Sequence, residues 1–253
     1  MVDIHSHILP GLDDGAQTLE DSVAMLRLAA ESGTTDIVAT PHANHQFTFN
    51  PDRITARIAE VQQAASPALR IHRGCDFHLT LENIQDALAH PGKYAINHLS
   101  YLLVEFSDLL IPRTTQEIFD RLISAGLTPI ITHPERNALL HARLDQLQSW
   151  VENGALVQIT AGSLLGNFGR TAKAVSADLM NRNLVHFVAS DAHDTKYRTP
   201  VLRDACQYVA QTWGASLAET LFTTAPQAVI SGQAIELSDP RQPPKKKWFH
   251  FGF

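Results

Sequence analysis

Short apolar, β-branched runs alternate with amphipathic segments along most of the chain, and this alternation constrains the fold more than any other feature. The runs that predict strands are Val2–His5, Asp36–Thr40, Leu69–Gly74, Leu102–Phe106, Pro129–Thr132, Ala155–Thr160 and Leu184–Ala189. Helical patterns lie between them, with a capping signal at Thr18 and helix ends at Gly33, Gly126 and Gly154. Such alternation is typical of βα units around a parallel sheet or barrel, so we expect an α/β fold.

A chain of 253 residues is long enough for one such unit, since single α/β barrels of roughly 200–250 residues are common. The sequence has no internal repeat and no Gly/Ser linker, and we predict one domain over residues 1–237. Residues 238–253 are rich in proline and then in basic and aromatic residues, and they are predicted to form a tail. The tail either touches a membrane surface or a partner, or packs on the domain or stays loose.

Charge, hydropathy and cysteine content exclude several classes of protein. With 26 acidic and 20 basic residues the net charge is -6, which argues against nucleic acid as the main partner. The longest apolar stretch is far shorter than the roughly 20 residues of a membrane span, and Met1–His5 carries no charged-then-apolar leader. We therefore expect a soluble, cytoplasmic protein. Cys75 and Cys206 lack CxxC spacing and are expected to be buried thiols.

Imidazole and carboxylate side chains recur where the predicted strands end. His5 and His7 lie two residues apart, and on an extended backbone such a pair points to the same side. Nine candidate metal ligands follow this pattern or lie in the first loop: His5, His7, Asp14, His42, Asp76, Glu105, His133, Asp191 and His193. In parallel βα architectures catalytic residues converge at the carboxyl ends of the strands, so we expect these nine side chains to meet.

A set this rich in carboxylates would repel itself without cations, although each member alone is more often a structural group. The sequence therefore predicts a metal centre. Because the set contains no thiolate, its nitrogen and oxygen ligands favour Mn, Fe or Zn. Of the remaining histidines, His45 and His78 are the strongest candidates for a role because they lie beside proposed ligands. All eight are otherwise expected to be structural or surface residues: His45, His72, His78, His90, His98, His141, His186 and His250.

Two arginines follow ligand motifs. Arg136 ends the sequence His-Pro-Glu-Arg that begins at His133, and Arg198 lies a short distance after Asp191 and His193. A guanidinium group beside bound metals is well shaped to hold a phosphate with two hydrogen bonds, and an ordinary surface ion pair is the alternative. We therefore consider Arg136 and Arg198 candidate catalytic residues.

Six motifs in sequence order resemble those of the polymerase and histidinol phosphatase (PHP) superfamily. They are Asp3-Ile4-His5-Ser6-His7, Leu12-Asp13-Asp14-Gly15, Thr40-Pro41-His42, Val104-Glu105-Phe106-Ser107, His133-Pro134-Glu135-Arg136 and Ala189-Ser190-Asp191-Ala192-His193. More narrowly, the chain up to about Ile230 looks like the bacterial tyrosine phosphatases of this superfamily, which accompany capsule and exopolysaccharide synthesis. The resemblance implies a distorted seven-stranded βα barrel of PHP type with three metal ions, usually manganese. It also implies that all nine candidate ligands hold these ions and that both arginines contact the phosphate.

The chain departs from this family pattern at one position. Asp76 stands where the family usually has Glu. Because Asp is one methylene shorter, the metal spacing can differ or an ion can be held less tightly.

The resemblance further implies a metal-dependent protein-tyrosine phosphatase, with phosphotyrosine on the tail of a bacterial tyrosine kinase as its substrate. Two alternatives remain open from the sequence. One is a small-molecule phosphatase, such as one for histidinol phosphate, and the other is a non-catalytic, metal-stabilised scaffold that recruits a kinase. Phe47 and Phe49, in the loop after His42, either flank a substrate ring or simply pack.

Overall fold

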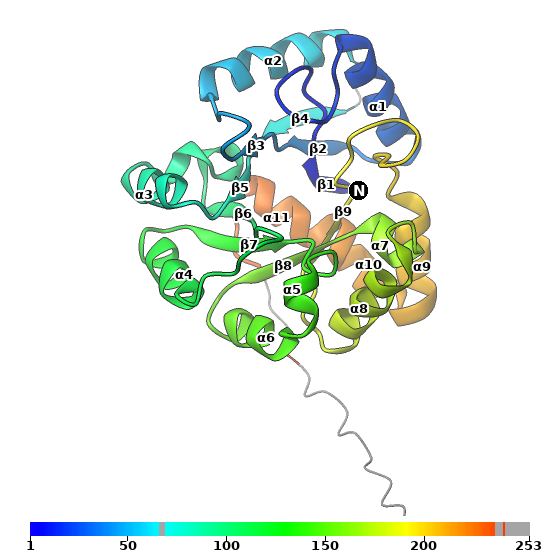
Figure 1. Ribbon diagram of the computed structural model, residues 1–253. Helices are drawn as coiled ribbons and strands as arrows, with labels where there is room; N and C mark the ends of the chain where they lie inside the picture. Colours follow the sequence, from blue (N-terminus) through cyan, green and yellow to red (C-terminus); the bar gives the residue numbers. More distant parts are fainter. Residues whose placement is uncertain (66–68, 236–239, 241–253) are drawn as a thin grey trace, which may run out of the picture.

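The computed structural model describes residues 1–65, 69–235 and 240, and every strand pair within them is parallel (Figure 1). A three-stranded sheet has the order β1 (Val2–Ser6), β2 (Asp36–Ala39), β4 (Arg70–Arg73). A six-stranded sheet has the order β3 (His42–Ala43), β5 (Asp76–His78), β6 (Tyr101–Glu105), β7 (Thr128–Thr132), β8 (Leu156–Thr160), β9 (Phe187–Ala189). The parallel α/β fold predicted from the sequence is therefore confirmed.

The two sheets are joined at two places, where one continuous segment of the chain provides a strand to each sheet. Strands β2 and β3 are separated only by Thr40 and Pro41, and β4 and β5 only by Gly74 and Cys75. Proline has no N–H to continue a ladder, so the strand is interrupted there. An isolated parallel bridge from Ser6 to Ala192 links β1 to the segment after β9. Among the described residues the ladders form two sheets, and no closed barrel is present.

Helices surround these strands in Figure 1, most of them on the outside. They are α1 (Leu19–Glu31), α2 (Pro51–Ala64), α3 (Leu81–Ala89), α4 (Thr115–Ser124), α5 (Ala138–His141), α6 (Leu144–Glu152), α7 (Ala161–Leu165), α8 (Gly169–Asn181), α9 (Arg203–Trp213), α10 (Ala215–Glu219) and α11 (Ala225–Ser231). The predicted capping box of α1 is present, because Thr18 and Asp21 bond each other's backbone N–H groups. The predicted stops also hold, since Gly33, Gly126 and Gly154 each adopt a positive φ after a helix.

Helix α11 closes the amino ends of the strands. Its residues Val229 and Ile230 share an apolar cluster with Val2, Leu156 and Phe187, each of which is the first residue of a strand. A larger apolar cluster lies between the strands and the outer helices. The carboxyl ends of the strands are consequently left for polar side chains, as the sequence predicted.

Three further predictions concern the tail, membrane-spanning helices and the two cysteines. The predicted tail, residues 238–253, lies outside the described residues except for Pro240, so its separation from a domain over residues 1–237 stays a prediction. In the described part of the chain, no helix has both the length and the apolar character needed to cross a membrane. Both thiols are free, Cys75 buried and Cys206 partly buried.

Candidate metal centre

The pair at the end of β1 is oriented as its spacing predicted. His5 and His7 are buried, and their Nε2 atoms lie 3.3 Å apart. Their Nδ1 atoms face other groups, at 2.9 Å from Gln158 Oε1 and 2.7 Å from Asp13 Oδ2, respectively. Such outer partners fix the orientation of each ring, so both Nε2 atoms are directed to the carboxyl edge of the strands.

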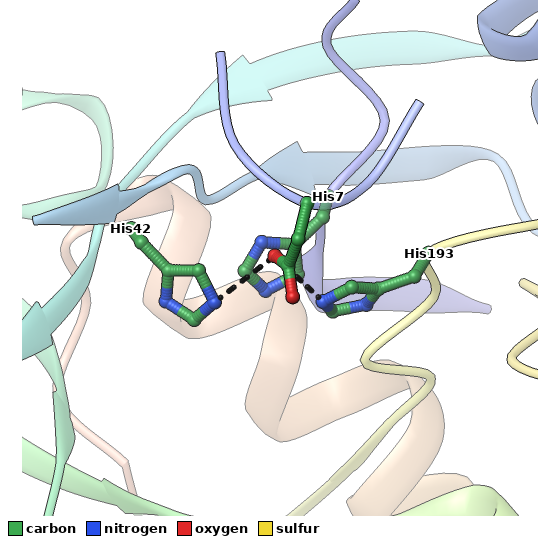
Figure 2. A group of neighbouring side chains, drawn as sticks. His7, His42 and His193 are labelled. Carbon is green, nitrogen blue, oxygen red and sulfur yellow. Dashed lines mark ion pairs between the residues drawn. The ribbon is translucent and has the colours of Figure 1, made fainter. Parts of the chain in front are cut away.

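One group of candidate ligands consists of His7, Asp14, His42 and His193. Figure 2 shows His42 and His193 on opposite sides of a carboxylate, with the His7 ring behind it. The Asp14 Oδ1 atom lies 3.4 Å from His42 Nε2 and 3.4 Å from His193 Nε2. Gly15 permits this loop to lie on β1, because a Cβ atom there would stand 2.0 Å from the His7 carbonyl oxygen.

Asp76, at the start of β5, occupies the middle of the cluster. Its Oδ2 atom lies 3.5 Å from His5 Nε2 and 3.1 Å from His42 Nδ1. The side chain is fully buried, yet neither carboxylate oxygen has a partner in hydrogen-bond geometry among the described residues. Burial alone would raise the pKa of Asp76, but the facing imidazoles of His5 and His42 hold it well below its usual range. The site therefore contains a buried carboxylate that requires a cation.

His5, His133 and Asp191 form a further group at the ends of β1, β7 and β9. Asp191 Oδ1 lies 3.5 Å from the Nε2 atoms of both His5 and His7. His133 and Asp191 have φ values of 31° and 51°, in the left-handed region that non-glycine residues rarely adopt. This costs each residue on the order of 1–3 kcal/mol, and such strain is characteristic of functional sites.

The two candidate arginines reach the same cluster. The guanidinium groups of Arg136 and Arg198 both donate to Asp191 Oδ2. Their partner is thus a candidate ligand and not a carboxylate on an outer helix. The Arg136 guanidinium also lies over the Phe168 ring, with 4.4 Å between Cζ and the ring centroid. Phe168 fits against Gly162, where a Cβ atom would come within 2.9 Å of the ring. Phe168 was not singled out from the sequence because it lies on a different loop from either arginine motif.

All nine predicted side chains thus belong to at least one group of neighbouring donors, and the groups overlap through shared members. One further residue, His78, joins His42, Asp76 and Glu105. His78 is, with His45, one of the two strongest candidates for a role among the remaining histidines, but it is not among the nine predicted ligands. The signal was the same as for the His5 pair, since Asp76 and His78 are two residues apart on a strand. That signal was missed because β5 itself was not predicted.

Other residues near the site behave differently. His45 is exposed and belongs to no candidate metal group among the described residues. Phe49 is buried and packs against Tyr94, with ring centroids 4.9 Å apart, so it is a packing residue. Phe47 is only partly buried and stacks on His42 at 6.0 Å. Only Phe47 of this pair lies where it could contact a substrate ring.

Several cavities open beside the cluster, and two of them are lined by Glu105. A small one of about 90 Å³ is lined by Glu105, His133 and Arg136. A larger one of about 350 Å³ is lined by His78, Glu105 and Leu110, among other residues. A phosphate group and an attached side chain could therefore reach the candidate ligands from solvent.

The donor atoms suit divalent metal ions. An imidazole nitrogen and a carboxylate oxygen that share one ion, each about 2.0–2.2 Å from it, are about 3–3.5 Å apart. The separations of 3.5 Å between Asp76 or Asp191 and the facing His5 and His7 rings are of this size. The set offers only nitrogen and oxygen donors.

Comparisons with known proteins agree with this geometry. The sequence model of a family described as "Capsular polysaccharide synthesis, CpsB/CapC" matches residues 1–231. Tyrosine-protein phosphatase YwqE of Bacillus subtilis (strain 168) is 36% identical over 261 residues, which cover 99% of this chain and 100% of that protein. Putative tyrosine-protein phosphatase CapC of Staphylococcus aureus is 37% identical over 207 residues, 80% of this chain and 81% of that protein.

One of the solved structures that are similar to this chain also resembles it in sequence. It comes from work on YwqE from Bacillus subtilis and CpsB from Streptococcus pneumoniae, described as unique metal-dependent tyrosine phosphatases. The TM-score is 0.90 at 34% identity, over 97% of this chain and 100% of that chain. A β-aspartyl dipeptidase from Fervidobacterium islandicum, with a TM-score of 0.57 at 14% identity, shares the fold alone.

Proposed function

Because the chain belongs to the CpsB/CapC family of capsular polysaccharide synthesis, we propose that it is a metal-dependent protein-tyrosine phosphatase that acts in capsule and exopolysaccharide synthesis. One observation carries this conclusion. The strand ends and the first loop bring nine imidazole and carboxylate side chains together beside two arginines, and a buried carboxylate, Asp76, lies among them without a hydrogen-bond partner in the described part of the chain.

We propose that the nine side chains hold three divalent ions, with manganese preferred and Fe or Zn as alternatives. Asp76 is placed to be shared, since its carboxylate belongs to one group of donors with His5 and His7 and to another with Glu105. When bound, such ions supply Lewis-acid stabilisation of the phosphoryl oxygens and make a nearby water more acidic.

The chain's own residues would bind and orient the phosphate. Arg136 and Arg198 share Asp191 Oδ2, and each guanidinium has further N–H donors free for phosphate oxygens. Phe168 holds one face of Arg136 and so limits where its donors point. Asp13 and Gln158 orient the His7 and His5 rings through their Nδ1 atoms. Hydrolysis moves the phosphoryl group from the tyrosine oxygen to water, and two oriented arginines offset the charge on its oxygens.

The physiological substrate is proposed to be phosphotyrosine on the tail of a bacterial tyrosine kinase in the cytoplasm. A flexible peptide suits a site that opens to a cavity of about 350 Å³. Phe47, stacked on His42, offers an apolar surface for the tyrosine ring.

The finer description of the fold belongs to the same proposal. Taking β2 with β3 and β4 with β5 as single interrupted strands gives seven strands, and the Ser6–Ala192 bridge would complete a distorted barrel. Residues 1–237 would form this catalytic domain and residues 238–253 an appended tail.

The test compares kcat/KM for a phosphotyrosine peptide, a phosphoserine peptide and histidinol phosphate under identical manganese loading, which cancels differences in metal occupancy. The phosphotyrosine peptide should be preferred. A tenfold or greater preference for histidinol phosphate, about 1.4 kcal/mol of discrimination, would support the small-molecule alternative. Turnover by no phosphate ester, with metals bound, would support the scaffold.

A second arm excludes a cysteine mechanism. Thiol-dependent tyrosine phosphatases have Arg six residues after the catalytic Cys, whereas this chain has Leu81 after Cys75 and Thr212 after Cys206. Chelation should abolish turnover and added manganese should restore it, while replacement of Cys75 and Cys206 by Ala should leave the rate nearly intact. Loss of activity in this double variant with metals still bound would contradict the proposal.

A further inference from the structure

His78 lies in the candidate metal centre but is not one of the nine proposed ligands. It follows Asp76 on the same face of β5 and lines the larger cavity beside the site. We propose that His78 is a tenth metal ligand and supplies an imidazole nitrogen to the ion held by Asp76 and Glu105. The inference rests on the metal-dependent function proposed above.

The contacts of Glu105 place His78 at this ion. Glu105 presents its two carboxylate oxygens to different imidazoles. Oε1 faces His133 Nε2 at 3.7 Å, whereas Oε2 is in contact with His78 Nε2 and lies 3.5 Å from His42 Nδ1. His78 Nε2 also lies 3.4 Å from His42 Nδ1, and its donor atom belongs to one group with those of His42, Asp76 and Glu105.

His42 cannot readily serve this ion as well. Its Nε2 atom faces Asp14, in the group that also contains His7 and His193 (Figure 2). A neutral imidazole binds one ion through one nitrogen and donates a hydrogen bond from the other. His42 Nδ1, 3.1 Å from Asp76 Oδ2, is then an N–H group directed toward the carboxylate and not a second ligand atom. On this side of Glu105, His78 is left as the nitrogen ligand.

The charges at this position also favour a cation. Asp76 and Glu105 are both carboxylates, and their donor atoms lie within 4.8 Å of one another, so two negative charges in this largely buried place repel each other. A neutral His78 that only accepted or donated a hydrogen bond would leave that repulsion in place. An ion bound by all three side chains removes it.

The competing role for His78 is that of a hydrogen-bond partner of Glu105, and two substitutions separate the roles. His78→Gln keeps an N–H donor for Glu105 and removes the imidazole nitrogen. His78→Asp supplies an oxygen ligand that repels Glu105 unless an ion lies between them. His45→Ala is the matched control, because His45 lines the same cavity but belongs to no candidate metal group among the described residues.

The experiment uses the untagged full-length protein, stripped with a chelator and titrated with Mn²⁺ alone. Bound metal is measured by elemental analysis after gel filtration, and affinity by isothermal titration. Loss of an outer partner of a metal site costs roughly 10–100-fold in affinity, so loss of a ligand in His78→Gln should weaken one ion by about 100-fold or more. His78→Asp should recover part of that loss, and His45→Ala should match the wild type.

The outcomes separate this inference from the function it rests on. Equal metal content and affinity in His78→Gln and wild type, to within about twofold, would overturn the role of His78 and leave the metal-dependent function intact. A wild-type protein that binds no manganese, iron or zinc would overturn both. If His78→Gln loses the ion, circular dichroism and the melting temperature of the chelated proteins must match wild type. A lower melting temperature of chelated His78→Gln, with no recovery in His78→Asp, would assign His78 a structural role and contradict the proposal.

Discussion

Asp191 shows how far single side chains at this centre depend on one another. Its Oδ1 atom faces His5 and His7, and its Oδ2 atom accepts from both Arg136 and Arg198. Burial alone would raise the pKa of Asp191, but the facing His5 and His7 rings and the Arg198 guanidinium hold it well below its usual range. In the proposed mechanism the arginines therefore have two roles, since they donate to Asp191 and bind the phosphate.

Replacing either arginine should separate metal binding from phosphate recognition. In Arg136→Ala and Arg198→Ala the ions should stay, while a charge-assisted contact to phosphate worth about 1.5–3 kcal/mol is lost. We expect kcat/KM on a phosphotyrosine peptide to fall by roughly tenfold to a hundredfold or more, and lysine to rescue only in part. Elemental analysis supplies the control. Variants that match wild type at every substrate concentration would show that neither arginine contacts the phosphate.

Phe168 should act on the reaction only through Arg136. A cation over an aromatic ring is worth about 0.5–2 kcal/mol, so Phe168→Leu should raise KM and the inhibition constant for inorganic phosphate by about 2- to 30-fold. Metal content should not change, and Phe168→Tyr, which keeps the ring, should restore both constants. If Leu and Tyr gave the same constants, the ring would be a packing residue alone.

At the scale of secondary-structure elements, each predicted strand run overlaps an observed strand and the predicted helix ends hold, but the short strands β3 and β5 were not predicted. Thr18 marks the start of α1, and Gly33 and Gly126 mark the ends of α1 and α4. Each of these signals involves only residues that are close to it in the sequence. Strand breaks depend on distant neighbours. Gly74, for example, approaches Val38 so closely that a Cβ atom would come within 2.8 Å of its side chain. The short strand β5 and the role of His78 could not be predicted from local sequence for this reason.

A hydrogen bond between Val157 in β8 and His186, just before β9, is predicted to be lost at acidic pH. His186 Nδ1 accepts a hydrogen bond from the Val157 backbone N–H at 3.0 Å, and burial lowers the pKa of His186 to about 4. The folded-state pKa lies below the unfolded value of 6.5, so the unfolded chain takes up the proton first. The stabilisation is complete above pH 6.5 and is lost progressively as the pH falls toward 4.

His186→Asn should remove this dependence, because the amide oxygen can accept the same bond without taking up a proton. From pH 7.5 to pH 5, the free energy of unfolding of the wild type should fall by about 2 kcal/mol more than that of the variant. Urea unfolding of both chelated proteins at each pH measures the difference. Titration of the metal ligands contributes equally to both proteins and therefore cancels. Parallel pH profiles would contradict a neutral, buried His186.

For the whole molecule, the sequence was informative about which residues meet but not about how they share ions. The strand-end pattern, with Asp14 from the first loop, predicted nine of the residues that meet in the cluster, because parallel strands bring their carboxyl ends to one edge. The pairing within the cluster depends on loop geometry. Asp14 reaches His42 and His193 only because the loop after β1 lies directly against His7 at Gly15.

A protein that gathers this many carboxylates at one edge should depend on its ions for stability as well as activity. An ion that binds only the folded state, present at 100 times its dissociation constant, contributes about 2.7 kcal/mol. For a chain of this size each kcal/mol corresponds to about 2–4 °C, so manganese should raise the melting temperature of chelated protein by about 5–10 °C for one ion alone. Calorimetry on chelated and manganese-loaded protein measures this shift.

The double variant His5→Ala/His7→Ala should lose the shift. Removal of both rings leaves Asp76 and Asp191 to face each other without the nitrogen ligands that complete an ion's coordination. We expect manganese to leave the melting temperature of this variant unchanged and elemental analysis to find little bound metal. His90→Ala, at an exposed histidine paired with Asp86, should keep the full wild-type response. If the double variant bound the wild-type complement of metal and gained the same stability, the histidines of β1 would be structural and the ions would lie elsewhere.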